Sequence, residues 1–156
     1  KGQKESQGYY RDPDGTEEAR SDGWLHTGDL ATVDRDGYFY IVDRKDDMIV
    51  SGGENIYPRE IEEVLYEHPA IQECAVIGVP DPMKGEDIKA FVLLKSEYQG
   101  KVSEQDIIDF TKENLAAYKY PREVKFVRSL PKSGVGKILR RTLREKEAKR
   151  RAKKST

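Results

Sequence analysis

The chain has 156 residues, a length that fits one compact domain or a small domain carrying part of another, and excludes a large multi-domain enzyme. Hydrophobic residues make up 36% and charged residues 37%, which predicts a modest core under a heavily charged surface. No apolar run approaches the ~20 residues that span a bilayer, and a single cysteine, Cys74, excludes an intramolecular disulfide. We therefore expect a soluble protein of a reducing, cytoplasmic compartment.

The N-terminal part of the chain predicts one β-hairpin. Residues 1–28 are polar and glycine-rich, which is typical of a surface segment with little core of its own. Strands are expected at 30–34 and 38–42, because Asp36-Gly37 between them supplies the positive φ angles of a tight reversal. This segment is interpreted as the end of a larger domain.

Five charged residues at 43–47 interrupt the apolar pattern and mark a domain boundary. After it, apolar strands and amphipathic helices interleave over about 110 residues, which favours a small two-layer α+β domain with a short sheet and flanking helices. Pro58 at a first helical position and a capping-box pattern at Ser103 to Asp106 start the two helices. The expected strands are 48–50, 71–79, 88–94 and 124–128, and the helices follow Tyr57 and Ser103.

The C-terminal tail is strongly basic. Residues 137–156 contain 10 Lys or Arg and 2 Asp or Glu. The pattern predicts an amphipathic helix with Ile138, Leu139 and Leu143 on one side, interpreted as a solvated terminal helix. A contact of this tail with nucleic acid or an anionic membrane is the alternative.

Several familiar site patterns fail on spacing. Gly134-Val135-Gly136-Lys137 lacks the first glycine and the following Ser or Thr of a phosphate-binding P-loop. Asp12 to Gly15 and Asp34 to Gly37 lack the later acidic ligands of a calcium loop, so they are interpreted as turns. His26 and His68 have no Ser or Cys partner at a recognisable spacing for a nucleophilic triad.

Three segments occur in an order that points to one family: Gly23-Trp-Leu-His-Thr-Gly-Asp29, then the run from Val42 to Glu62, then Leu130-Pro-Lys-Ser-Gly-Val-Gly-Lys-Ile-Leu-Arg140. Together they closely resemble the adenylate-forming acyl-CoA synthetases. These enzymes use ATP to convert a carboxylate to an acyl-adenylate and then pass the acyl group to coenzyme A.

The resemblance implies a division of the chain. Residues 1–45 match the end of the large adenylating domain, a loop and a β-hairpin, and residues 46–156 match the small mobile C-terminal domain. The Ser/Thr/Gly-rich phosphate loop of the large domain does not occur in this sequence. We therefore expect this piece to be inactive alone and to work with its own N-terminal domain.

The resemblance also implies roles for residues near the hinge. Asp29 matches the carboxylate that binds the ribose hydroxyls of ATP, and Arg44 matches the second ribose contact; on pattern alone, a turn Asp and a surface ion pair are the alternatives. Asp46 matches the hinge about which the small domain turns.

A second set of residues is implied for coenzyme A. Gly52 and Gly53 match the segment bordering the pantetheine channel, where a backbone without side chains lets the thin arm pass. Tyr118 matches an aromatic residue that stacks on the adenine. Where relatives carry a phosphate-contacting Arg this chain has Tyr120, and Lys119 is the proposed substitute.

Lys137 matches the catalytic lysine of the adenylation step. Negative charge gathers as the carboxylate attacks the α-phosphate, and one ammonium group that reaches both can orient and neutralise them. The alternative for an isolated lysine after Gly-Val-Gly is an exposed loop residue.

These residues predict part of an AMP-forming ligase, most similar to long-chain fatty acid–CoA ligases. The complete enzyme is expected to use a fatty acid, ATP, Mg²⁺ and coenzyme A, with no metal ligand in this chain and no nucleic acid partner. Transfer of the acyl group to a carrier protein is one alternative. A non-catalytic module that binds nucleic acid or a membrane through the basic tail is another. For the ligase itself, peripheral membrane contact through the basic tail is a second expected location beside the cytoplasm.

Overall fold

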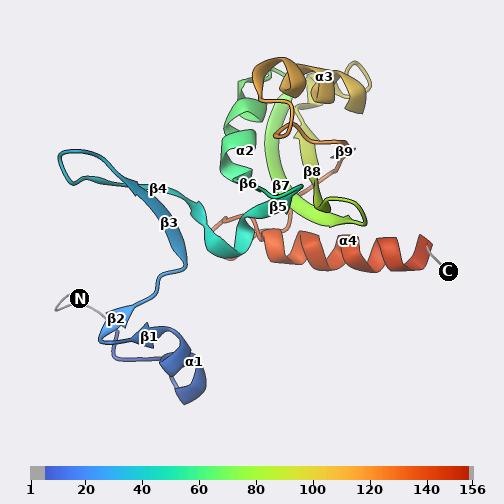
Figure 1. Cartoon of the computed structure of the whole chain (residues 1–156). Helices are drawn as coiled ribbons and strands as arrows, with labels where there is room; N and C mark the ends of the chain where they lie inside the picture. Colours follow the sequence, from blue (N-terminus) through green and yellow to red (C-terminus); the bar gives the residue numbers. More distant parts are fainter. Residues whose placement is uncertain (1–5, 155–156) are drawn as a thin grey trace. The chain divides into compact units, whose positions relative to one another are not determined.

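The structure is a computed structural model that describes residues 6–154, and the chain divides into two compact units between Asp46 and Asp47 (Figure 1). In the described part of the chain, no helix is long and apolar enough to cross a membrane. The first unit contains α1 (Pro13–Glu18), β1 (Arg20–Ser21), β2 (Trp24–Leu25), β3 (Asp29–Val33) and β4 (Phe39–Arg44).

The predicted hairpin is present as the antiparallel pair β3–β4. Gly37 takes a φ of +86°, as the Asp-Gly turn requires. The Asp34 carboxylate fixes the turn, because it accepts hydrogen bonds from the backbone N–H groups of Asp36 and Tyr38 and from the Tyr40 hydroxyl. These bonds, that from the Tyr38 N–H above all, lower the pKa of the Asp34 carboxyl.

The second unit is built on one five-stranded sheet. Its strands lie in the order β6-β5-β8-β7, antiparallel throughout, and β9 runs parallel to β8 beside Lys89 to Val92. The elements are η1 (Lys45–Asp47, a 3-10 turn that spans the boundary), β5 (Ile49–Ser51), β6 (Glu54–Ile56), α2 (Pro58–Glu67), β7 (Ile71–Asp81), β8 (Gly85–Leu94), η2 (Ser96–Tyr98), α3 (Glu104–Asn114), β9 (Glu123–Phe126) and α4 (Arg140–Lys154).

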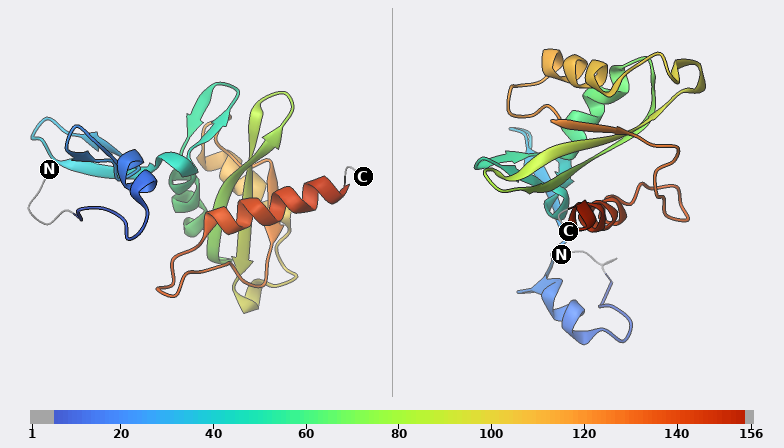
Figure 2. Two further views of the ribbon diagram at one scale, coloured as in Figure 1. Left: turned by 90° about the horizontal axis from the view of Figure 1, so that it is seen from below. Right: turned by 90° about the vertical axis from the view of Figure 1, so that its right-hand side faces the viewer.

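Helices cover both faces of this sheet (Figures 1 and 2). One face packs against α2 and α3 through side chains that include Ile61, Leu65 and Ile107, all 0% exposed. The other face, which carries Ile77 and Phe91, packs against Leu143 of α4. The α+β class and the sheet with flanking helices are confirmed, and α4 adds a layer on the second face.

Local chemistry explains where the two central helices begin. Pro58 occupies the first turn of α2, where its missing N–H costs nothing. At α3 the Ser103 hydroxyl accepts from the N–H of Asp106, and the Asp106 carboxylate accepts from the N–H of Ser103, so the predicted capping box is confirmed.

Strands β7 and β8 are longer than the sequence predicts. Their register continues past Val79 through Pro80 to Asp81, which pairs with Gly85. Pro80 is tolerated because β7 is an edge strand, where one side of the backbone needs no ladder hydrogen bond. The connection between the two strands is therefore shorter than the gap between the expected strands at 71–79 and 88–94.

The C-terminal helix is more tightly bound than the predicted solvated helix. Leu143 is 5% exposed and Glu147 is 3% exposed, so one face of α4 packs on the sheet. Leu139, which the sequence places on the apolar side, is instead 38% exposed, and Ile138 is partly buried. Hydrophobic periodicity does not predict this buried face, because one of its two buried residues is the charged Glu147.

Candidate functional site

Asp29 and Arg44 lie opposite each other at the open end of the β3–β4 hairpin. The Arg44 Nε lies 3.8 Å from the Asp29 Oδ1, and both side chains keep part of their surface exposed. The Arg44 guanidinium also donates to the Thr27 carbonyl at 3.3 Å, while the Asp29 N–H donates to the Thr27 hydroxyl. The two predicted ribose contacts are thus neighbours, presented by adjacent strands.

Gly28 is needed for this arrangement. It has a φ of +73°, and a Cβ there would come within 3.2 Å of the Arg44 Nη2. Its carbonyl accepts from the Lys45 N–H at 2.8 Å, which closes the base of the hairpin. Any larger residue would strain the turn and push the arginine away.

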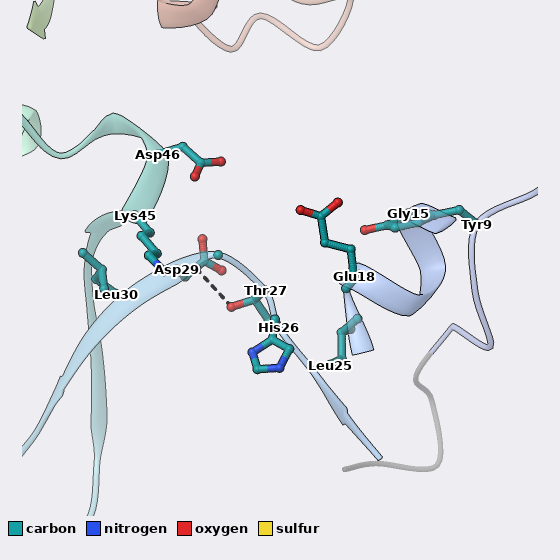
Figure 3. A pocket seen from close by; sticks show the side chains of 12 residues that line it. Tyr9, Gly15, Glu18, Leu25, His26, Thr27, Asp29, Leu30, Lys45 and Asp46 are labelled. Carbon is teal, nitrogen blue, oxygen red and sulfur yellow. Dashed lines mark hydrogen bonds between the residues drawn. The ribbon is translucent and has the colours of Figure 1, made fainter. Parts of the chain in front are cut away.

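A hollow of about 830 Å³ opens beside Asp29 (Figure 3). The Asp29 carboxylate reaches it from β3, and the exposed Asp46 also borders it. A carboxylate with two acceptor oxygens is suited to two vicinal hydroxyl groups. The residues lining the hollow are Tyr9, Gly15, Glu18, Ala19, Leu25, His26, Thr27, Gly28, Asp29, Leu30, Lys45 and Asp46.

Asp46, the predicted hinge, is the last residue of the first unit. It is the middle residue of the three-residue 3-10 turn η1, and Asp47 begins the second unit. A pivot needs a few residues between two bodies that can absorb a change in φ and ψ. Asp46 stands at such a position, and its role as the hinge stays a prediction.

Gly52 and Gly53 form a two-residue turn between β5 and β6. Their φ values are +60° and +88°, and Ser51 pairs with Glu54 across the turn, which is the geometry of a type I′ hairpin. A Cβ built on either glycine meets nothing within 4 Å. The positive φ angles of the turn therefore favour glycine at both positions, and no side chain covers the backbone there.

The Gly52 turn and Tyr118 border one cavity of about 330 Å³. Tyr118 is 46% exposed, so its ring can be reached by a ligand. The structure thus brings together two of the residues predicted for coenzyme A, which lie far apart in sequence. The residues lining the cavity are Ser51, Gly52, Glu54, Lys84, Asp87, Ala117, Tyr118 and Arg122.

Two cationic side chains in this cavity are not predicted by the sequence. Lys84 lies on the β7–β8 turn, 3.7 Å from the Asp87 carboxylate. The Arg122 guanidinium stacks 3.7 Å from the centre of the Tyr120 ring and donates to the Ala117 carbonyl. The only sequence signal for Arg122 is a basic residue directly after Tyr120-Pro121, and Lys84 gives none.

Lys119 points to a different partner. Its ammonium group donates to both oxygens of the Glu60 carboxylate, at 2.7 and 2.8 Å, and these hydrogen bonds raise its pKa. It is not among the residues that line the cavity. A role of Lys119 in binding phosphate stays a prediction, and it would require this ion pair to open.

Lys137 lies on an exposed loop before α4. The loop is held at its base by a bridge between Lys132 and Ile138, and the Ser133 hydroxyl accepts from the Lys137 N–H at 3.1 Å. Gly136 has a φ of +82°, and Val135 at the tip is 92% exposed. This is a protruding turn that carries a lysine, the shape needed to reach into a site on another body.

His26 contacts a serine through the fold of a hairpin. Its Nε2 lies 2.7 Å from the Ser21 hydroxyl, because the β1–β2 hairpin brings the two residues together. Both residues are exposed. Five residues across a hairpin is a spacing that the triad patterns do not cover.

Much of the basic tail is engaged within the fold. Lys89, 0% exposed on β8, bonds to Glu123 and, at 2.9 Å, to Glu147 of α4. Arg150 and Arg151 bond to the same two glutamates. Burial would raise the pKa of the Glu147 carboxyl, but hydrogen bonds from Arg150 and Lys89 outweigh it and lower the pKa to about 2. These arginines therefore neutralise the buried Glu147 carboxylate and the partly exposed Glu123 carboxylate, which argues against a free basic arm.

Comparisons with known proteins identify the family of the chain. The family model described as the AMP-binding enzyme C-terminal domain matches residues 60–137. A long-chain-fatty-acid–CoA ligase of Bacillus subtilis is 52% identical over 147 residues, which cover 94% of this chain and 26% of that protein. A feruloyl-CoA synthase of an Amycolatopsis species is 48% identical over 139 residues, which cover 89% of this chain and 28% of that one.

A solved structure gives the same result for the fold. The Mycobacterium tuberculosis fatty acyl CoA synthetase matches 90% of this chain and 27% of its own, with a TM-score of 0.67 and 45% identity. The chain thus spans about a quarter of the length of the relatives it matches. From the family match and these identities, the chain belongs to the AMP-binding enzyme C-terminal domain family, the small domain of adenylate-forming acyl-CoA synthetases.

Proposed function

We propose that the complete protein is an AMP-forming acid–thiol ligase that joins a carboxylic acid to coenzyme A, and that this chain supplies its small domain and hinge. The support is family membership, together with relatives named as CoA ligases. The enzyme would first make an acyl-adenylate from the acid and ATP, releasing pyrophosphate. It would then transfer the acyl group to the thiol of coenzyme A and release AMP.

The observation that carries this proposal is the cavity shared by Gly52 and Tyr118. The bare turn suits the passage of a narrow pantetheine arm close to the backbone. The exposed Tyr118 ring offers a stacking surface for an adenine base. Lys84 and Arg122 supply positive charge beside it, and a guanidinium is well matched to phosphate oxygens.

The other predicted residues serve the first step. Asp29 and Arg44 are proposed to hold the ribose of ATP, as neighbours on β3 and β4. Lys137 is proposed to bridge the carboxylate and the α-phosphate, where it would neutralise charge that develops during attack. Mg²⁺ would accompany the phosphates of ATP, and the described residues 6–154 contain no cluster of three or more metal-ligating side chains to hold it.

For the acid, we propose a long-chain fatty acid. The support is the 52% identity to a ligase named for that substrate, while the 48% identity to a feruloyl-CoA synthase makes an aryl acid the competing candidate. We further propose a cytoplasmic location, in keeping with the free, buried thiol of Cys74.

The direct test is an acceptor assay with the full-length protein. Palmitate or ferulate is supplied with ATP and Mg²⁺, and either coenzyme A or a phosphopantetheinylated carrier protein is offered. We expect palmitoyl-CoA as the main product, with Tyr118→Ala raising the KM for coenzyme A and leaving acid-dependent pyrophosphate release unchanged. Preference for the carrier protein would overturn the choice of acceptor, and preference for ferulate would overturn the choice of acid.

A further inference from the structure

Three segments that are distant in sequence are tied together by Arg140, the first residue of α4. Its guanidinium donates to the Glu62 carboxylate through Nε at 3.1 Å and Nη2 at 2.5 Å, and to the Asp47 Oδ2 through Nη1 at 3.0 Å. Arg144 donates to the other Asp47 oxygen at 2.9 Å. We call Asp47, Glu62, Arg140 and Arg144 the clasp.

Three of the four clasp side chains are shielded from solvent, unlike those of an ordinary surface ion pair. The side chains of Asp47, Glu62 and Arg140 are 14%, 12% and 18% exposed. A forked, two-point contact between guanidinium and carboxylate fixes orientation as well as distance. Partial burial reduces screening by water and salt, so the geometry is held more firmly than by the exposed pair Arg141–Glu145 on the same helix.

The clasp also links the helices on the two faces of the sheet across its edge. Glu62 lies on α2, on one face, and Arg140 begins α4, which packs on the other face (Figure 2). Between them runs the edge strand β7, and the Glu62 Oε1 accepts from the Val76 N–H at 2.8 Å. Glu62 is thus fixed to the sheet itself and gives Arg140 a rigid anchor.

The position of the clasp in the chain suggests its role. Asp47 directly follows the proposed hinge residue Asp46, and Arg140 follows the proposed catalytic Lys137 by three residues. Lys137 is separated from the hinge by about 90 residues of sequence, but through Arg140 its loop is bonded to the residue beside the hinge. The Gly52 turn needs no such link, because β5 follows Asp47 closely in the chain.

We propose that Arg140 is a positioning residue that couples the Lys137 loop to the hinge, so that rotation at Asp46 delivers Lys137 to the adenylation site in a fixed orientation. The proposal rests on the function proposed above. It predicts that loosening the clasp harms adenylation, which needs Lys137, more than thioester formation, which uses the Gly52 side of the domain.

The test uses Asp47→Asn in the full-length enzyme, which weakens both arginine contacts and leaves the Arg140–Glu62 pair intact. We expect acid-dependent pyrophosphate release to fall at least ~10-fold, while thioester formation from pre-formed acyl-AMP and coenzyme A stays within about 2-fold. Arg140→Lys should show the same split, because one ammonium group cannot reproduce the forked contacts. Arg141→Gln, at the exposed neighbouring arginine, is the matched control and should change neither step.

Thermal unfolding of each variant reports whether the fold survives. If Asp47→Asn unfolds the domain, Arg140→Lys alone decides the proposal. Equal loss in both steps, or no loss in either, overturns the coupling role and leaves the proposed ligase activity standing. Lys137→Ala is measured in parallel, because normal adenylation by that variant would show that the proposed role of Lys137 itself is wrong, and the coupling would fall with it.

Discussion

The two units of the chain differ in how they use their apolar side chains. In the second unit, Leu65, Val76 and Ile88 are at most 1% exposed, and helices cover both faces of the sheet. In the first unit, Asp43 is the only buried residue among those described, while Phe39 is 77% exposed. The same chain therefore contains one unit with a core and one without.

The difference shows which forces hold each unit. The β3–β4 hairpin forms because Asp34 and Gly37 dictate its turn, and its backbone ladder needs no core. A two-stranded hairpin alone is marginally stable in water, and the exposed aromatic side chains of Tyr38, Phe39 and Tyr40 indicate a surface that packs against another body. We propose that the hairpin packs on the large adenylating domain of the complete protein.

The contrast between the two units is tested by shortening one side chain in each unit of the 156-residue chain. Leu65→Ala in the core of the second unit should lower the free energy of unfolding by about 2–5 kcal/mol, because it leaves a cavity. Ile41→Ala, 55% exposed on β4, should change it by less than about 0.5 kcal/mol. Urea unfolding measures both. A large loss from Ile41→Ala would mean that the first unit contributes to a shared core.

The functional side of the comparison is sharpened by Lys137→Ala in the full-length enzyme. Loss of one preorganised charge should reduce adenylation by about 10²–10³-fold, while thioester formation from pre-formed acyl-AMP stays near the wild-type rate. Asp29→Ala, in the first unit, should instead act mainly through a higher KM for ATP. Pyrophosphate release and thioester formation are assayed separately. Equal loss of both steps in Lys137→Ala would indicate misfolding of the loop.

The buried charges of the second unit predict a dependence on pH. Glu147→Gln should cost about 1–3 kcal/mol at pH 7, because it weakens the pairing of the buried Lys89. The pKa of Glu147 is about 2 in the folded state against an ordinary value of 4.5, so the unfolded chain takes up the proton first as pH falls. The stabilisation is complete above pH 4.5 and is lost toward pH 2.

Urea unfolding at pH 7 and near pH 2 checks this sign. The difference between the wild-type chain and Glu147→Gln should shrink at the lower pH. Glu145→Gln, whose side chain is 56% exposed on the same helix, is the control and should show little effect at either pH. A difference that persists near pH 2 would mean that the Glu147 charge is not the source of the stabilisation.

Local features of the fold were predictable from the sequence, and long-range pairings were not. The turn at Gly37, the start of α2 at Pro58 and the capping box at Ser103 each depend on a few adjacent residues. The Lys89–Glu147 pair spans 58 residues, and the Glu62–Arg140 pair spans 78. Such pairs depend on which helix covers which face of the sheet, and hydrophobic periodicity does not determine that.

For the candidate sites, too, single positions were predictable from the sequence and neighbours in space were not. Resemblance to the family supplied Asp29, Gly52 and Tyr118 as separate positions, and the structure places Gly52 and Tyr118 at one cavity. Lys84 and Arg122 enter that cavity because the β7–β8 hairpin and the loop before β9 meet there, which is a property of the tertiary fold. Sequence reasoning finds residues with a known pattern, while neighbours in space need coordinates.

The smallest expected effect concerns the turn formed by Gly52 and Gly53 between β5 and β6 of the second unit. Gly53→Ala should cost about 1–2 kcal/mol of stability, because a residue with a Cβ is disfavoured at a φ of +88°. Gly134→Ala is the matched control, since its surroundings are equally open and its φ lies outside the positive region, and it should be neutral or slightly stabilising. Urea unfolding of the 156-residue chain compares the two.

In the full-length enzyme, Gly53→Ala should also raise the KM for coenzyme A, because the added methyl group narrows the path beside the turn, while adenylation continues at the wild-type rate. A variant that loses stability but keeps its KM for coenzyme A would show that the glycine pair serves the hairpin alone.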